Sequence, residues 1–406
     1  MNTDRKRFDT IVIGKGLIGA AAARHLSRQQ AQVAVIGPDE PTDKLTASSE
    51  QAVFASHYDA GRVIRCIDID PNWTQLNIMA ASQFAHLEAA SRIRFHYPVG
   101  CLYASPEPAD PYLAQVRQTA AQHHLSVQQF ESNALLHEAY PDYHFELPVR
   151  GVAEATPAGH INPRALIEAQ LAVFQANGGA IFRDTVTVIE PIGNGLEVHT
   201  LQGRSYHTEK ALVAAGAFTN CFDLLRRKLA LTLKSETVIL AQVNAAEAAR
   251  LARLPSLLYE LDMPELEGIY LIRPLRYPDG NFYLKMGCNF PTDHIFTTLT
   301  QIQAWFVFGD SEVHHTLLRQ TLQALMPNLT IERTVTKRCV LTRTVHKRPY
   351  IGPVDHNNRL FVAVGGNGYA AMCSDGIGQV AARLVLTRSL PPVFSPDAFQ
   401  PVFVHP

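Results

Sequence analysis

The stretch FDTIVIGKGLIGAAAARHLSRQQAQVAVIG at residues 8–37 decides the fold. A short β-branched segment leads through a glycine-rich turn into an alanine-rich segment, and a second β-branched segment follows, as in a βαβ unit. Gly14, Gly16 and Gly19 form G-x-G-x-x-G at the strand-to-helix junction. The first glycine allows a tight turn, the second admits a pyrophosphate to the backbone, and the third lets helix and strand pack closely. The helix N-terminus adds positive potential, so the stretch predicts dinucleotide binding.

The acidic residue that would hold the ribose of such a dinucleotide is not in its usual place. It should end the second strand, but Gly37 stands there, and Asp39 follows in GPDEP. A shifted carboxylate at Asp39 can take the ribose. Alternatively, Asp39 only begins a turn beside Pro38. The residues alone leave both interpretations open.

Composition excludes several functional classes. The 36 basic and 37 acidic residues give a net charge of -1, which argues against a nucleic-acid partner. The six cysteines are scattered without a CxxC pair, which argues against a metal site and a disulfide framework. The N-terminus lacks the pattern of a signal peptide, and no apolar run is long enough to span a membrane. We therefore expect a soluble, cytoplasmic protein that acts on a small molecule.

The length of 406 residues favours two domains. After the βαβ unit, a helix ending near Ala176, a strand in ALVAAGAFTN (211–220) and a strand–turn–helix pattern in RLFVAVGGNGYAAM return the chain to a parallel sheet. GIYLIRPLR–YPDGN–FYLKMG predicts a hairpin in a second domain. We predict an α/β dinucleotide-binding domain from 1–85, 150–225 and 332–395, and an α+β domain with an antiparallel sheet from 86–149 and 226–331. A Pro-rich tail, 396–406, is expected to run extended over the surface.

Several of these motifs occur together in one known family. GKGLIG, PAGHINP at 157–163, VAAGAFTN and the C-terminal glycine turn resemble the FAD-dependent D-amino-acid oxidase superfamily, and in particular its monomeric sarcosine oxidase branch. The resemblance implies a glutathione-reductase-like Rossmann domain that binds FAD and a second domain that binds an amine. It places the following residues at the cofactor: Gly14, Gly16, Gly19, Asp39, Ser48, Ser49, Gly216, Cys339, Gly366 and Gly368.

ASHYDAGRVIR at 55–65 is similar to the Ser-His…Asp…Arg-x-x-Arg segment of that branch, with one extra residue between Asp59 and Arg62. The resemblance implies that His57 and Arg62 lie beside the flavin ring and that Arg65 holds the substrate carboxylate. A guanidinium suits that role because it donates two parallel hydrogen bonds. The alternative is a solvated basic segment.

RCVLTRTVHKRPYIGP at 338–353 resembles the CxxTxT stretch that carries the flavin-linking cysteine, here Cys339. A cation that lowers the thiol pKa would assist such a link, and Arg338 and Arg343 are the sequence candidates. The alternative is an ordinary buried cysteine.

Lys285 lies within FYLKMGC (282–288), a strand that should bury at least one face. A lone strand lysine usually protects a sheet edge. However, LKMG resembles the family segment whose lysine activates oxygen. A fixed ammonium stabilises the negative charge that O₂ acquires when it accepts an electron.

Met372 departs from the family pattern, because it falls where the family places a lysine that grips the substrate carboxylate. Sarcosine is therefore an unsafe assumption. Either Arg273 compensates, or the substrate is larger and less charged at that end, where methionine suits an apolar group. The alternative for Arg273 is a surface strand arginine.

These residues predict an FAD-dependent oxidase of an amino acid, N-methyl amino acid or cyclic imino acid, with O₂ reduced to H₂O₂. A dehydrogenase that passes electrons to a quinone or a partner protein is the alternative. A flavin-binding subunit without turnover is a third possibility. No residue identifies itself as a general base, and the oligomeric state stays open.

Overall fold

The structure is a computed structural model that describes residues 7–41, 58–106 and 111–405. Ser48, Ser49 and His57 lie outside the described residues. The predictions made for them therefore remain predictions.

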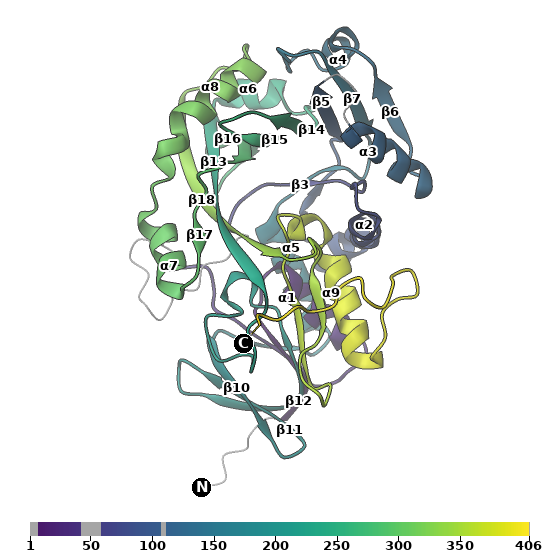
Figure 1. Cartoon of the computed structure of the whole chain (residues 1–406), viewed down its shortest axis with the longest axis vertical. Coiled ribbons are helices and arrows are strands. Elements are labelled where there is room, and N and C mark those ends of the chain that lie inside the picture. Colours follow the sequence, from purple (N-terminus) through teal and green to yellow (C-terminus); the bar gives the residue numbers. More distant parts are fainter. Residues whose placement is uncertain (1–6, 42–57, 107–110, 406) are drawn as a thin grey trace.

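A largely parallel sheet covered by helices forms the lower half of the molecule in Figure 1. Its elements are β1 (Arg7–Ile13), α1 (Leu17–Ser27), β2 (Val33–Ile36), α5 (Pro163–Ala176), β9 (Ala180–Phe182), β10 (Val186–Ile192), β11 (Gly195–Thr200), β12 (Ser205–Val213), β19 (Tyr350–Pro353), β20 (Leu360–Val364) and α9 (Ala370–Thr387). The βαβ unit, the helix ending at Ala176 and the C-terminal strand and helix are confirmed.

The β1 strand lies at the centre of this sheet. It pairs in parallel with β2 on one side and with β12 on the other, and β9 and β20 continue the parallel order. The hairpin of β10 and β11 extends the sheet in antiparallel fashion beyond β12. Because β1 is covered on both faces, its residues Ile11–Ile13 read as a continuous apolar run.

A large, mostly antiparallel sheet forms the upper half in Figure 1. Its strands are β5 (Cys101–Pro106), β6 (Val127–Phe130), β7 (Val149–Glu154), β13 (Leu231–Val243), β14 (Ser256–Asp262), β15 (Glu267–Arg276), β16 (Phe282–Asn289), β17 (Ile295–Phe296) and β18 (Arg333–Thr344). The helices of this half are α3 (Pro111–Gln122), α4 (Asn133–Ala139), α6 (Ala245–Arg250), α7 (Leu299–Phe308) and α8 (His315–Leu325), and Ser311–His314 adds a 3₁₀ turn.

A small sheet and a long helix lie between the two halves. The small sheet has the order β3 (Arg62–Ile64), β8 (Gly159–Ile161), β4 (His96–Tyr97). The long helix α2 (Pro71–Ser91) packs against α9 and α5. A 3₁₀ turn at Gly216–Phe218 follows β12. β3 lies within the predicted flavin-side segment 55–65 and contacts α9 of the lower half and β15 of the upper half.

The hairpin of β15 and β16 is confirmed, and its position shows whether Lys285 lies on an edge strand or an interior strand. β16 pairs with β13 on one side and with β15 on the other, so that Lys285 lies opposite both Leu240 and Ile272. Lys285 is therefore on an interior strand and is only 1% exposed. Protection of a sheet edge cannot be its role.

The strands β7 and β18 belong to a different sheet from the one that the predicted domain boundaries assign to them. Both pair within the large sheet, β7 with β5 and β6, and β18 with β13 over twelve residue pairs from Leu231 to Gln242. The sequence prediction placed 150–225 and 332–395 with the dinucleotide-binding domain. The flavin-linking candidate Cys339 thus enters the site from the large sheet, because β18 follows β13 along its whole length.

The prediction of a surface tail was wrong. Phe394 and Phe399 stack edge to face and are buried in the core that also contains Trp73 and Ile377. The Ile351 N–H donates to the carbonyl oxygen of Phe399, and Phe403 forms a β-bridge with Leu229. The prolines end regular structure there, but the aromatic side chains between them are anchored.

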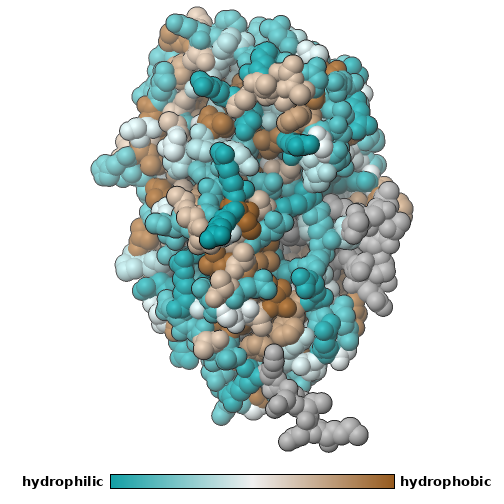
Figure 2. Space-filling view, turned by 180° about the vertical axis from the view of Figure 1, so that it is seen from behind, coloured by the Kyte–Doolittle hydropathy of each residue, from teal (hydrophilic) through white to brown (hydrophobic). Residues whose placement is uncertain are grey.

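Hydrophobic side chains on the surface are scattered. Figure 2 shows them interspersed with hydrophilic ones on the face opposite to that of Figure 1. Across the described ranges, no helix is both long and apolar enough to cross a membrane. All six cysteines are free thiols.

Candidate active site

A cavity of about 530 Å³ runs from the carboxyl ends of the parallel strands to the large sheet. Gly14, Gly37 and Ala214 lie at its parallel-sheet end, and Cys339 and Tyr270 lie at the other. Crevices at the carboxyl ends of parallel strands are the usual place for dinucleotides in such folds. The following predicted cofactor residues line it: Gly14, Gly16, Asp39, Gly216, Cys339, Gly366 and Gly368.

The glycine-rich turn leaves no room for side chains. Gly14 has φ +98°, and a Cβ there would overlap the carbonyl oxygen of Ala214. A Cβ on Gly19 would overlap the Gly14 carbonyl oxygen, so the third glycine allows the close approach of α1 to β1. The backbone therefore forms a cradle at the start of α1 that fits the pyrophosphate of FAD.

Two carboxylates line the cavity after β2. Asp39 is paired with Lys15 and, at 2.7 Å, with Arg183. Burial raises the pKa of Asp39, but the hydrogen bond and charge of Lys15 and the charge of Arg183 have a larger, opposite effect. The pKa of Asp39 is therefore below its ordinary value. Glu40 accepts two hydrogen bonds of 2.6 Å from Arg164 of α5. Asp39 is thus more than a turn residue, and Glu40 is a second candidate for the ribose.

At the other end of the cavity, Cys339 and Glu236 are cross-strand partners on β18 and β13. Glu236 accepts a 3.0 Å hydrogen bond from the Tyr270 hydroxyl. Burial and the Glu236 charge raise the pKa of the Cys339 thiol, whereas Arg62 and Lys285 act in the opposite direction. The net effect is that the pKa of the Cys339 thiol is raised.

The cation beside the thiol is Arg62, and neither sequence candidate takes this place. Arg62 Nη2 lies 3.8 Å from Cys339 Sγ. Arg338 instead donates to the carbonyl oxygen of Gly309, and Arg343 donates to Asn289. The prediction for those two arginines was wrong, because the strand directs them away from the thiol.

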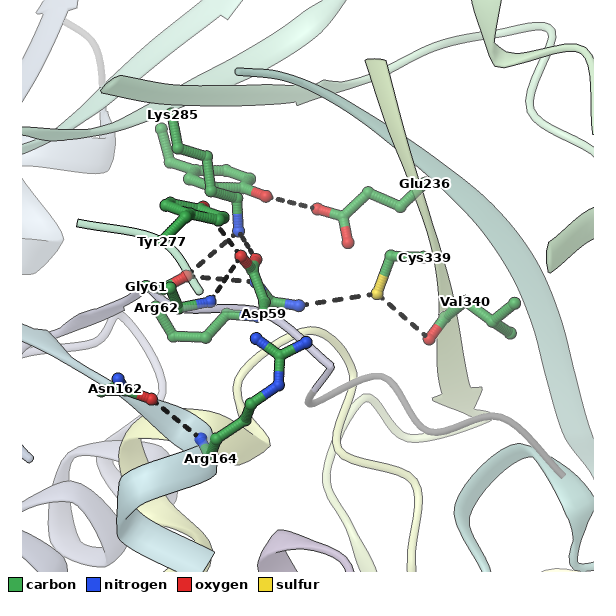
Figure 3. A network of polar contacts seen from close by, with 12 residues as sticks. Asp59, Gly61, Arg62, Asn162, Arg164, Glu236, Tyr277, Lys285, Cys339 and Val340 are labelled. Atoms are coloured by element: carbon green, nitrogen blue, oxygen red, sulfur yellow. Dashed lines mark hydrogen bonds and ion pairs between the residues drawn. The ribbon is translucent and has the colours of Figure 1, made fainter. Parts of the chain in front are cut away.

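Asp59 is the centre of a charged cluster beside the cavity (Figure 3). Lys285 Nζ lies 2.6 Å from Asp59 Oδ2 and 3.2 Å from the Gly61 carbonyl oxygen. Arg62 forms an ion pair with the same carboxylate, and the Tyr277 hydroxyl donates to it at 2.8 Å. Lys285 and Arg62 share this carboxylate, and Glu236 supplies a second carboxylate nearby, so the formal charges of these four side chains balance.

Lys285 is held just behind the cavity wall. Its Nζ lies 5.3 Å from the ring centroid of Tyr270, which lines the cavity together with Arg62. Burial and the Arg62 charge lower the pKa of the Lys285 ammonium well below its ordinary value, and Glu236 acts in the opposite direction. The Asp59 carboxylate also favours the charged form. The charge of Lys285 is therefore close to the cavity and out of water.

Arg65 also lines the cavity, but its guanidinium already has partners. Its Nη2 lies 2.7 Å from Asp68, and Nη1 donates to the Ile67 carbonyl oxygen. The guanidinium carbon lies 5.8 Å from the Tyr103 ring centroid and 5.4 Å from that of Tyr369. Burial opposes its charge, but Asp68 raises the pKa of Arg65 well above its usual value.

The structure brings Met372 to the cavity and leaves Arg273 outside it. Met372 lies in the first turn of α9, is buried and contributes to the lining. Among the described residues that line the cavity, Arg273 is missing. Its charge acts on His160 of the small sheet, where burial and then Arg273 lower the pKa of the imidazole to about 3. Arg273 is thus neither an exposed arginine nor a second cation beside Arg65.

Four residues of the site carried no role in the sequence interpretation: Asp59, Asp68, Glu236 and Tyr270. Asp59 and Asp68 lie three residues before Arg62 and three after Arg65, so short-range charge pairing was a usable signal. Glu236 is a lone acid in the β-branched strand LKSETV, the same kind of signal that singled out Lys285. Tyr270 gave no such signal.

Comparison with known proteins identifies the family of this chain. A family model described as DAO, FAD dependent oxidoreductase, matches residues 9–384. The monomeric sarcosine oxidase of Bacillus sp. (strain B-0618) is 22% identical over 382 residues, which cover 94% of this chain and 92% of that protein. The N-methyl-L-tryptophan oxidase of Salmonella arizonae is 27% identical over 52% of this chain and 54% of its own length.

Among solved structures, the open form of NikD, an unusual amino acid oxidase essential for nikkomycin biosynthesis, superposes with a TM-score of 0.76. The two chains are 18% identical, and the match covers 98% of each. At this identity the likeness shows a shared fold. With the family match over residues 9–384, the chain belongs to the DAO family of FAD-dependent oxidoreductases.

Proposed function

We propose that this protein oxidises the C–N bond of an amine, with O₂ as the electron acceptor and H₂O₂ as a product. The observation that carries this proposal is the buried Lys285 beside the cavity. Its pair with Asp59 offsets the cost of burial, and the same pair holds the ammonium against Tyr270, at the wall of the cavity. The relatives named as sarcosine and N-methyl-L-tryptophan oxidases support an N-substituted amine as the substrate class. The six free thiols support a reducing, cytoplasmic location.

When bound, FAD supplies the chemistry that removes hydrogen from the amine and returns the electrons to O₂. The chain supplies position and charge. Gly14 and Gly16 would hold its pyrophosphate, Gly19 keeps α1 close to β1, and Asp39 or Glu40 would take its ribose. Arg62 and Lys285 keep positive charge where negative charge develops. Tyr270 and the neighbouring side chains close this end of the cavity.

A covalent link at Cys339 is the second part of the proposal. Arg62 beside the sulfur stabilises the thiolate, which is the reactive form, against the opposing effects of burial and Glu236. We expect acid precipitation of the purified protein to leave yellow colour in the pellet, and of Cys339→Ser to release it to the supernatant. Cys288→Ser, another buried cysteine of the large sheet, is the control and should keep the colour in the pellet. Soluble colour from the parent would contradict the link and keep the FAD fold.

The choice of electron acceptor distinguishes this function from its alternatives. We expect amine-dependent bleaching of the flavin absorbance under argon, and rapid return of the colour and peroxide formation when O₂ is admitted. Return of colour only with an artificial acceptor such as a quinone would favour the dehydrogenase. No bleaching by any amine would leave the flavin-binding subunit.

A further inference from the structure

The cations that line the cavity already have partners, and this bears on the substrate if the proposed function holds. Each one forms an ion pair with a carboxylate of this chain: Lys15 with Asp39, Arg62 with Asp59, Arg65 with Asp68, and Arg164 with Glu40. A substrate carboxylate would have to compete with one of these carboxylates. It would meet no uncommitted lysine or arginine among the described residues of the lining.

Arg65 is the most strongly committed of these cations. Both of its Nη atoms have acceptors within the chain, and two tyrosine rings cover the guanidinium. The segment that follows it is fixed as well. Glu154 of β7 accepts hydrogen bonds of 2.8 Å and 3.2 Å from the backbone N–H groups of Cys66 and Ile67. Since Asp68 follows immediately, the carboxylate that neutralises Arg65 belongs to a rigid loop.

Glu236 lines the cavity at the Cys339 end and differs from these committed groups. Its one hydrogen bond among the described residues comes from the neutral Tyr270 hydroxyl. No lysine or arginine of the described chain lies within ion-pair distance of it, although Arg62 and Lys285 act on it at longer range. Glu236 therefore keeps an acceptor capacity that a substrate N–H group can use.

The remaining lining near Cys339 and Arg65 is mostly apolar, with Thr342 and Asn367 as polar members. Its larger apolar side chains are Val63, Leu258, Leu341, Tyr369 and Met372. Such a surface favours an alkyl or aryl substituent and disfavours a second charge.

We propose that the substrate is a cationic amine that carries an apolar substituent and no carboxylate, and that Glu236 binds its ammonium group. Asp68 then acts as a specificity residue, because it neutralises the one arginine that the family pattern assigns to a substrate carboxylate. Met372 acts in the same direction, because it places an uncharged thioether where the family pattern has a lysine that binds the carboxylate of an amino acid.

The first experiment measures the binding of two probes to the FAD-loaded protein through the change in flavin absorbance. The probes are benzoate and protonated 2-phenylpropan-2-amine, which both carry a phenyl ring and differ in charge. The amine keeps the N–H groups that Glu236 would bind, and it cannot be oxidised to an imine because the carbon next to its nitrogen carries no hydrogen. We expect the cation to bind roughly tenfold or more tightly than the anion. Tighter binding of benzoate to the parent protein would overturn the inference without any variant.

Two variants identify the residues responsible. Asp68→Asn should increase the affinity for benzoate roughly tenfold, because it releases Arg65. Glu236→Gln should decrease the affinity for the cationic probe by a similar factor. Glu267→Gln is the matched control, because it removes an exposed carboxylate of β15 outside the cavity lining and should change neither affinity. Unchanged probe affinities in both Asp68→Asn and Glu236→Gln would also overturn the assignment.

A substrate pair separates this inference from the proposed function. N-methylphenethylamine and N-methylphenylalanine differ only in the carboxylate, and we expect the first to bleach the flavin faster under argon. Faster bleaching by the second would overturn the inference and keep the amine oxidase. Bleaching by neither, with the cation probe still preferred, would overturn the oxidase and keep the charge preference.

Discussion

Replacing Lys285 with methionine should slow the reaction with O₂ by roughly 30- to 1,000-fold and leave bleaching by the substrate nearly unchanged. A fixed ammonium stabilises a developing anion by about 4 kcal/mol at about 4 Å and by about 2 kcal/mol at about 8 Å, at an effective dielectric near 20. The range reflects the position of Lys285 just behind the wall formed by Tyr270 and Arg62. Stopped-flow absorbance, with the two half-reactions measured separately, gives both rates.

Lys234→Met is the matched control for this substitution. Lys234 is also buried in the large sheet, but its partners Asp293, at 2.5 Å, and Asn289 lie outside the cavity lining, whereas Lys285 lies against the lining residue Tyr270. Both variants lose a buried lysine, so a general disturbance of the sheet would affect them alike. Equal rates with O₂ in Lys285→Met and the parent protein would refute the oxygen-activating role.

The pH dependence of the same half-reaction reports the protonation of Lys285. Burial and Arg62 lower the pKa of this ammonium, so its charge is lost as the pH rises through a value below the ordinary 10.5. The rate with O₂ should therefore fall on raising the pH in that range, and Lys285→Met should lack this fall. Bleaching by the substrate has its own pH dependence and serves as the internal comparison.

Replacing Asp375 with asparagine should lower the free energy of unfolding by about 3–5 kcal/mol, because it leaves a buried arginine without its counter-charge. Asp375 of α9 is fully buried. It accepts hydrogen bonds of 2.7 Å and 3.0 Å from Arg24 of α1, 2.7 Å from His25 and 2.6 Å from Gln170 of α5. Urea unfolding followed by circular dichroism measures the loss.

The exposed pair of Arg7 and Glu209 provides the comparison. Glu209→Gln should change the unfolding free energy by less than about 1 kcal/mol, because solvent screens exposed pairs. A similarly small loss in Asp375→Asn would show that the three helices do not depend on the buried carboxylate.

Acid titration gives an independent check on the same group. Burial raises the pKa of Asp375, but His25, Arg24 and Gln170 lower it to a net value below the ordinary 3.8. A lowered pKa means that this stabilisation is complete above 3.8 and is lost as the pH falls through the lower folded value. The parent should therefore lose more stability on acidification than Asp375→Asn.

The sequence predicts this fold well where structure depends on neighbouring residues. Gly14, Gly16 and Gly19 specify a turn between adjacent elements, and Pro278–Gly280 specifies the hairpin that carries Lys285. The turn and the hairpin follow from backbone geometry and from the period of buried residues, which one stretch of sequence contains. Only the family resemblance assigned Arg65 and Met372 to the substrate, and the structure brings both to one cavity.

The partners of the site residues could not be predicted in this way. Asp59 and Lys285 are 226 residues apart, and Cys339 meets Glu236 only because β18 pairs with β13 in one register. Arg273 was predicted to supply a charge to the substrate, but its strand directs it to the small sheet beside His160. Periodicity indicates which face a residue occupies and gives no information about what faces it.

The position of β1 also has a consequence for synthesis on the ribosome. β1 is made first, but it needs β12 beside it, and β12 needs β20, which emerges near the end of the chain. The ion pair of Arg24 with Asp375 likewise joins residues 351 positions apart. The β12 edge and the face of α1 that carries Arg24 therefore stay uncovered until translation is nearly complete, which makes this protein a candidate for chaperone protection during synthesis.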